Sequence, residues 1–181
     1  MSLSIIILII IIILFSIFIF ASIVYNKFQD YIIKINEVEG KIDDTLRNKF
    51  DGILQMNNII KEIIKTNKAI VDDISKLKDK DISSFELDRK LADSLNKINF
   101  IIGQYEELKA IEKLNKLIYE IDEMDEALEA YKKFYNEKIV SYNKLIRIFP
   151  YNLIGMILKY KEKTFFDGKD MNDENIKDFK L

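Results

Sequence analysis

The chain has 181 residues and a formal net charge of −2, and this balance argues against nucleic acid as a partner, because phosphate binding needs a concentrated basic face. It contains no cysteine and no histidine, which excludes disulfides, thiolate and imidazole catalysis, and metal sites built from either side chain. One proline and five glycines, beside abundant Lys, Glu, Leu and Ile, leave few turns and predict an all-α fold of long helices.

The first predicted element is a transmembrane helix over residues 3–24, preceded by a short tail at residues 1–2. Only Ser4, Ser16 and Ser22 interrupt its apolar residues. A helix of this length spans about 33 Å, enough for a hydrocarbon core of about 30 Å. A cleaved signal peptide is the alternative, but no basic residue precedes the core, and the core exceeds the roughly 7–15 residues of such peptides. We therefore expect an uncleaved single-pass anchor whose partner is the lipid bilayer.

The charges around this anchor predict its orientation. Lys27 and Lys34 follow it, and no lysine or arginine precedes it. Positively charged flanks stay on the cytoplasmic side, and Tyr25 falls where interfacial aromatic side chains gather. We expect a protein of the cell membrane, with its N-terminus outside and its remaining domain in the cytoplasm.

Four helices are predicted between residues 25 and 150, from apolar residues spaced three and four apart. The first continues from the anchor without a break, and Asp51-Gly52 predicts the turn that ends it. The second extends from Ile53 to Leu77. A polar loop over residues 78–84 is expected to follow it.

The third predicted helix has Ser84 as its N-cap and carries apolar residues as far as Tyr105. The fourth runs from Ile111 to Phe149 and ends at Pro150, because proline has no N–H to donate and restricts the residue before it. Short connections make successive helices antiparallel neighbours. The expected fold over residues 25–150 is thus an antiparallel up-down four-helix bundle that continues the transmembrane helix, and the fourth helix should end near the bilayer.

Residues 151–166 form a segment rich in apolar and basic side chains, and it has two interpretations. In the first, Phe165 and Phe166 enter the membrane interface while Lys159, Lys161 and Lys163 face anionic headgroups. In the second, which we favour, the segment caps the open end of the bundle. Residues 167–181 are polar with mixed charge, and we expect them to be disordered.

Acidic residues supply the remaining candidates for chemistry, and none of them predicts a site. Asp43 and Arg47 are four residues apart, with Asp51 one turn further, which is typical of ordinary helical pairing. A belt on the fourth helix is typical of a solvated face; its glutamates are Glu120, Glu123, Glu126 and Glu129. No P-loop, dinucleotide fingerprint or nucleophile elbow is present. We expect no catalytic residue, no metal, no cofactor and no small-molecule substrate.

Two Tyr-Asn pairs followed by Phe-Pro mark the end of the fourth predicted helix, at Tyr135-Asn136, Tyr142-Asn143 and Phe149-Pro150. With the run YEELKAIEKLNKL at residues 105–117, this pattern resembles the C-terminal signature of the LemA family of bacterial membrane proteins. Nearer the anchor, the residues that stand in the family's order are Tyr25, Asn26, Asp43, Arg47 and Asp51. The resemblance covers nearly the whole chain after the anchor.

The chain departs from the family pattern between residues 38 and 55. Val38 and Glu39 replace an Ala-Trp pair, and residues 51–55 lack the family's proline. These changes indicate a divergent member. The resemblance implies an N-terminal membrane helix with its terminus outside, an antiparallel four-helix domain and no established biochemical activity.

The residues and the resemblance together predict a non-enzymatic, membrane-anchored helical-bundle protein. Its chemistry would be recognition of another protein by a helix face, as an interaction or scaffold module at the cell membrane. The alternative is a structural membrane protein that assembles with copies of itself.

Overall fold

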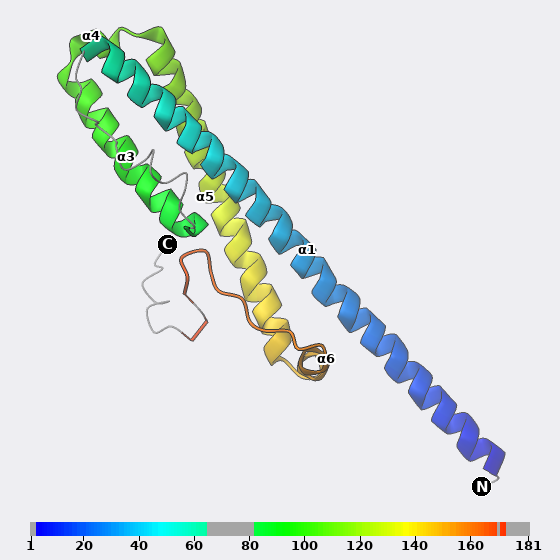
Figure 1. Cartoon of the computed structure of the whole chain (residues 1–181). Coiled ribbons are helices and arrows are strands. Elements are labelled where there is room, and N and C mark those ends of the chain that lie inside the picture. Colours follow the sequence, from blue (N-terminus) through cyan, green and yellow to red (C-terminus); the bar gives the residue numbers. More distant parts are fainter. Residues whose placement is uncertain (1–2, 65–81, 170, 173–181) are drawn as a thin grey trace. The chain divides into compact units, whose positions relative to one another are not determined.

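The described part of the chain is all-helical. The computed structural model describes residues 3–64, 82–169 and 171–172. Its helices, in chain order, are α1 (Leu3–Ile64), α3 (Ser84–Gln104), α4 (Glu106–Lys109), α5 (Glu112–Arg147) and α6 (Tyr151–Ile157) (Figure 1). These helices confirm the predicted all-α class for the described residues. Helix α1 is long and apolar enough to cross a membrane, with a mean hydropathy of 3.5 over its most apolar stretch.

Helix α1 passes through Asp51 and Gly52 without a break, so the turn predicted at these residues is wrong. Gly52 is buried inside the helix and faces Ile121 of α5. Apolar side chains on either side keep the helix packed, and their burial outweighs the cost of about 1 kcal/mol for a glycine in a helix. Up to Ile64, the first two predicted helices are therefore one helix. The predicted apolar positions Ile70, Ile74 and Leu77 lie outside the described residues.

Replacing Gly52 with alanine is expected to raise the free energy of unfolding by about 0.5–1 kcal/mol, because alanine favours the helix. The added Cβ would meet Ile121 at 3.4 Å, which is ordinary contact. The matched control is Gly40→Ala in the same helix, where nothing lies within 4 Å of the added Cβ. Chemical denaturation of the full chain in detergent measures both. A marked loss of stability in Gly52→Ala alone would contradict a continuous helix packed in this way.

The chain divides into two compact units, and α1 and α5 each contribute to both. The second unit consists of residues 38–134 and 166–168. Its core side chains come from α1, α3, α4 and α5 and include Leu46, Ile53, Met56, Leu91, Ile98, Leu108, Leu114 and Leu128. Their three- and four-residue spacing explains why these segments are helices that bury one side.

Helix α3 begins one residue earlier than predicted, and its cap differs. Ser83 is the N-cap, and its hydroxyl accepts a hydrogen bond from the Glu86 N–H at 3.2 Å. The predicted cap, Ser84, is instead the first helical residue, and its hydroxyl donates to Asp43 on α1. Of the loop predicted at residues 78–84, positions 78–81 lie outside the described residues.

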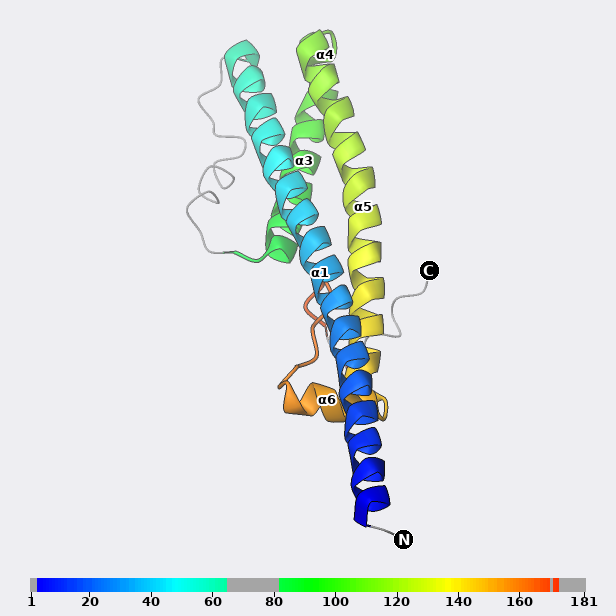
Figure 2. The ribbon, with the colours of Figure 1, turned by 90° about the vertical axis from the view of Figure 1, so that its right-hand side faces the viewer.

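The first unit contains residues 1–37, 135–165 and 169–181, of which residues 1–2, 170 and 173–181 are outside the described part. Helix α5 ends at Arg147, three residues before Pro150, so the predicted stop at this proline is confirmed. The Phe149-Pro150 peptide is cis, and α6 begins directly after it. Figure 2 shows α6 lying across α1 at the end of α5. The disorder predicted for residues 167–181 falls mainly on positions outside the described residues.

Candidate membrane-proximal site

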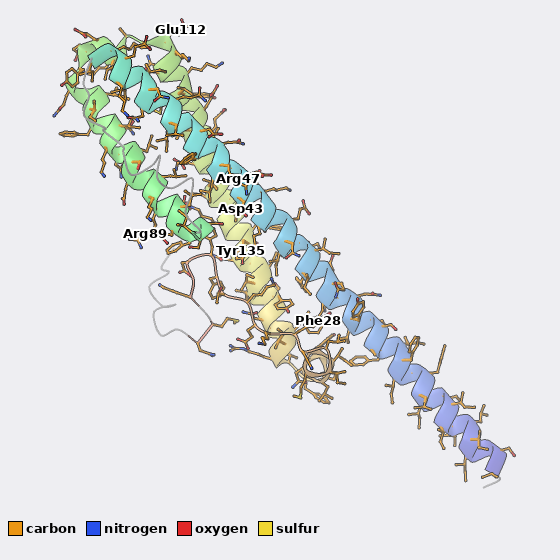
Figure 3. All side chains as sticks on the ribbon, viewed as in Figure 1. Phe28, Asp43, Arg47, Arg89, Glu112 and Tyr135 are labelled. Atoms are coloured by element: carbon orange, nitrogen blue, oxygen red, sulfur yellow. The ribbon has the colours of Figure 1, made fainter. Side chains whose placement is uncertain are left out.

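Phe28 is the centre of the core of the first unit. Its side chain is 0% exposed and lies on α1, just after the apolar stretch. The Tyr142 ring of α5 meets it edge to face, with ring centres 5.9 Å apart, and the Tyr160 ring lies 5.0 Å away. Helix α6 approaches so closely at Gly155 that a Cβ there would lie 3.5 Å from the Phe28 ring. Figure 3 shows Phe28 on α1 beside the end of α5 and α6.

Asn143 holds the segment that follows α6. Its side chain is fully buried, and its Nδ2 donates to the Lys163 carbonyl at 2.7 Å. The Lys163 N–H donates back to the Asn143 Oδ1 at 2.9 Å. The amide therefore pairs with this backbone as a neighbouring strand would, which satisfies polar groups that burial would otherwise leave unpaired. A second polar contact is the bond from Gln29 Nε2 to the Tyr160 hydroxyl, at 2.7 Å.

Arg147 and Glu162 form a two-bond ion pair across the same segment. Arg147 Nε donates to Oε1 of Glu162 at 2.7 Å, and Nη2 donates to Oε2 at 2.6 Å. The hydrogen bond from Arg147 lowers the pKa of the Glu162 carboxyl from its usual value. A lowered folded-state pKa means that the pair stabilises the fold above the ordinary pKa of 4.5 and is lost as the pH falls through the lower folded value. Because both groups are partly exposed, the contribution is small.

Helix α6 lies against the end of the apolar stretch of α1. The Tyr151 ring is 6.3 Å from the Phe20 ring, and the Lys27 ammonium lies 5.2 Å from the centre of the Tyr151 ring. Tyr151 and Ile154 pack on the core around Phe28. The other face of α6 is apolar and uncovered, with exposed side chains at Leu153, Met156, Ile157 and Leu158. Helix α6 therefore has one face packed on protein and one apolar face that no described residue covers.

Of the side chains considered for membrane contact, some pack on protein and others are exposed. Phe165 packs on the core around Phe28. Phe166 belongs to the second unit, where its ring meets Phe85 edge to face at 6.0 Å. Both rings thus contact protein, whereas the first interpretation of this segment places them in the membrane interface. Lys159 and Lys161 are exposed, whereas Lys163 is half-buried with its backbone bound to Asn143.

The remaining Tyr-Asn and Phe-Pro positions occupy different environments. Tyr135 is half-buried against the Phe28 core, and Asn136 is half-buried. Tyr142 is buried, and burial together with the nearby Tyr160 raises the pKa of its hydroxyl. Pro150 is half-buried, whereas Phe149 is 72% exposed. Tyr25 and Asn26 are exposed on α1, one turn before Phe28.

In the second unit, the predicted group of Asp43, Arg47 and Asp51 does not form a common site. Asp43 is half-buried and accepts the hydrogen bond from Ser84, whereas Arg47 and Asp51 are exposed (Figure 3). The buried polar residue on this stretch is Lys49, which pairs with Asp125 of α5. The sequence does not predict this pair, because a lysine on an amphipathic helix normally lies on the solvated face.

A second ion pair of this unit joins α3 to α5. Lys132 lies 2.7 Å from the Asp88 carboxylate and 3.0 Å from that of Glu129. Burial works to lower the pKa of Lys132, but hydrogen bonds to Asp88 and Glu129 outweigh it, and the pKa is raised. The Lys132 ammonium also lies 5.6 Å from the Phe166 ring centre. These contacts hold residues 166–168 on the second unit.

Other features of the described residues offer little for chemistry. Within residues 3–64, 82–169 and 171–172, no three carboxylates lie close enough to hold a metal ion. A shallow hollow on α3 is lined by Asn96, Lys97, Phe100 and Ile101. Two pairs of the first unit could not be predicted from the sequence, because no periodic pattern links partners so far apart. They are Gln29 with Tyr160, 131 positions apart, and Arg147 with Glu162, 15 positions apart.

A comparison with protein families identifies the family to which this chain is similar. The model of the LemA family matches residues 39–178, which is more than half of the chain. The matched region includes Asp43 and every Tyr-Asn and Phe-Pro residue of α5 and its end, whereas Tyr25 and Asn26 precede it. No curated protein matches the chain.

Proposed function

We propose that this chain, which belongs to the LemA family, is a non-enzymatic interaction or scaffold module held at the cell membrane by α1. The membrane part of the proposal is supported by the apolar side chains from Leu3 to Phe20, which are exposed along the helix. Leaving such a surface in water would be unfavourable, whereas lipid accommodates it. Lys27 and Lys34 follow the anchor, and such positive flanks favour a cytoplasmic location for the helical domain.

The observation that carries the interaction role is a group of exposed aromatic side chains flanking the connection from α3 through α4 to α5. Phe100 is 68% exposed, Tyr105 is 42% exposed and Tyr119 is 64% exposed. Aromatic residues are enriched in protein–protein interfaces, where they bury much area at little entropic cost. Phe100 also lines the hollow on α3. The proposed partner is therefore a protein that covers this end of the α3–α5 hairpin.

A single-cysteine cross-linking experiment tests both the partner and the side of the membrane, since the chain has no native cysteine. Asn96→Cys places the reactive thiol in the hollow, and the matched control is Asp122→Cys on an exposed turn of α5. Cells are treated with a membrane-permeant maleimide that carries a photoactivated group. We expect a discrete adduct from position 96 only, and we expect Phe100→Ser in the Asn96→Cys chain to remove it.

The same experiment separates the alternatives. An adduct with the mass of two copies would favour the self-assembling alternative, and equal adducts at both positions would contradict a specific surface. Treatment with a membrane-impermeant maleimide beforehand should leave the adduct unchanged if the domain is cytoplasmic. If that treatment prevents the adduct, the domain lies outside the cell and the proposed orientation is wrong.

A further inference from the structure

We propose that α6, together with Phe149, lies in the interface of the bilayer that α1 enters, as a second and shallower membrane contact. The apolar side chains Met156 and Ile157 would enter the boundary of the acyl chains, and the lysines after α6 would face anionic lipid headgroups. This inference rests on the proposed membrane location of α1. It goes beyond that location by assigning a lipid-binding surface to another part of the chain.

The first argument is the level of α6 along α1. The stretch from Leu3 to Phe20 spans about 26 Å at the helical rise, close to the roughly 30 Å of a hydrocarbon core. Its side chains are exposed, and Phe20 at its end contacts Tyr151 of α6. When α1 fills the core, Phe20 is at the membrane surface. Tyr151 also contacts Lys27, and Gly155 approaches Phe28, so α6 lies between the levels of Phe20 and Phe28, just outside the hydrocarbon core. Because α6 lies across α1 (Figure 2), its axis runs along the membrane plane.

The second argument is the uncovered apolar surface. Among the described residues after position 24, the most exposed large apolar side chains are Phe149 at 72%, Met156 at 72% and Ile157 at 74%. Leu153 and Leu158 extend the same surface. Several exposed large apolar side chains on one short segment normally mark a binding or membrane contact. Lipid is the occupant that the position favours, because α6 lies beside the end of the exposed apolar stretch of α1.

The third argument is charge. Lys159 and Lys161 are exposed directly after α6, and Lys27 and Lys144 are exposed on the neighbouring turns of α1 and α5. The nearby carboxylates of Glu162 and Asp30 are already paired, with Arg147 and Lys34 respectively. The local charge is therefore positive. Each lysine close to an anionic leaflet adds to the attraction.

The packing that holds α6 also suits this role. Tyr151 and Ile154 fix one face of the helix on the Phe28 core. The helix is therefore already formed before its other face meets lipid. The pairing of Asn143 with Lys163 holds the chain after the lysines. A short helix held in this way need not pay the ordering cost of a free peptide that binds lipid.

The test measures the depth of single fluorescent labels on the full chain in nanodiscs that contain anionic and zwitterionic lipid. Cysteine replaces Ile157 on α6, Ile11 in the middle of the apolar stretch, or Asn99 on an exposed turn of α3. For Ile157→Cys we expect a blue-shifted emission, quenching by lipids with a spin label near the headgroup, and several-fold weaker quenching by aqueous iodide than for Asn99→Cys. For Ile11→Cys we expect quenching by lipids that carry the spin label deep in the acyl chain.

The outcomes separate the inference from the function on which it rests. If the Ile11 label is not quenched by deep lipid labels, α1 is not inserted and the proposed membrane function fails. If the Ile11 label is buried but the Ile157 label is as open to iodide as the Asn99 label, only the role of α6 is overturned. Protection of Ile157 from iodide without quenching by lipid labels would mean that protein covers α6, which also overturns it.

The lysines are tested in the same nanodiscs. Replacing Lys159 and Lys161 with glutamine should reduce the blue shift of the Ile157 label when anionic lipid is present, and should leave it unchanged in zwitterionic lipid alone. The matched control is Lys97→Gln and Lys113→Gln on exposed turns of α3 and α5, which remove the same charge elsewhere. An equal effect of both double variants would overturn the assignment of these two lysines to headgroups.

Discussion

Replacing Phe28 with alanine should lower the free energy of unfolding by about 3–5 kcal/mol, the largest single effect that we expect in this chain. The side chain is fully buried, and it is the point where α1, α5, α6 and the segment after α6 meet. Removing the ring takes away its contacts with Tyr142 and Tyr160 and leaves a cavity that the rigid helices cannot close. Chemical denaturation of the full chain in detergent micelles measures the loss.

The matched control is Phe100→Ala, which removes the same side chain from an exposed position on α3. A surface substitution of this kind is expected to change stability by about 0.5 kcal/mol or less. Similar losses in the two variants would show that Phe28 is not a core residue. Because Gly155 of α6 also approaches this ring, Phe28→Ala should in addition increase the exposure of α6 to protease.

The sequence was sufficient for features that depend on local chemistry. The apolar stretch before Tyr25 predicts a helix because no other structure satisfies the backbone in lipid, and α1 covers it. Pro150 ends the last long helix, because its ring removes a donor and restricts Phe149. Helices α3 and α5 lie where the apolar spacing predicts them, since each must bury one side.

Features set by distant partners could not be predicted. Asp51-Gly52 has the composition of a turn, but burial of the helix around Gly52 against Ile121 of α5 keeps this stretch helical. The choice between these two roles depends on a residue that is far away in the sequence. The same holds for the buried Lys49, whose partner Asp125 is half-buried and 76 positions away. The predicted four-helix arrangement assumed a turn that α1 does not make.

The candidate site shows the same division. Tyr142 and Asn143 could be singled out from the Tyr-Asn pattern, but their roles could not be assigned. The position of α1 beside α5 shows that Tyr142 packs on Phe28, and the position of the chain after α6 shows that Asn143 pairs with Lys163. One of the two interpretations of residues 151–166 places the two phenylalanines at the end of this segment in the membrane interface. They contact protein instead, and the shorter side chains of α6 are left exposed.

The second large effect is expected for Asn143→Ala, which should lower the free energy of unfolding by about 2–4 kcal/mol. The substitution removes two hydrogen bonds at once and leaves the Lys163 N–H and carbonyl without these partners, each at a cost of about 1–3 kcal/mol. The loss should be largest for the segment after α6, because that segment depends on Asn143 for its pairing. Trypsin cleavage after Lys159 and Lys161 in the full chain should therefore become much faster than cleavage within α5.

Two further variants sharpen this test. Asn99→Ala makes the same change on an exposed turn of α3 and should alter neither stability nor cleavage. Asn143→Asp keeps an acceptor for the Lys163 N–H, but it places a carboxylate oxygen against the Lys163 carbonyl where Nδ2 donates in the native chain. It should therefore destabilise the segment at least as much as alanine at neutral pH. If Asn143→Asp behaved like the native chain, the donated bond to Lys163 would not be what holds the segment, and packing around Phe28 and Tyr160 would have to hold it alone.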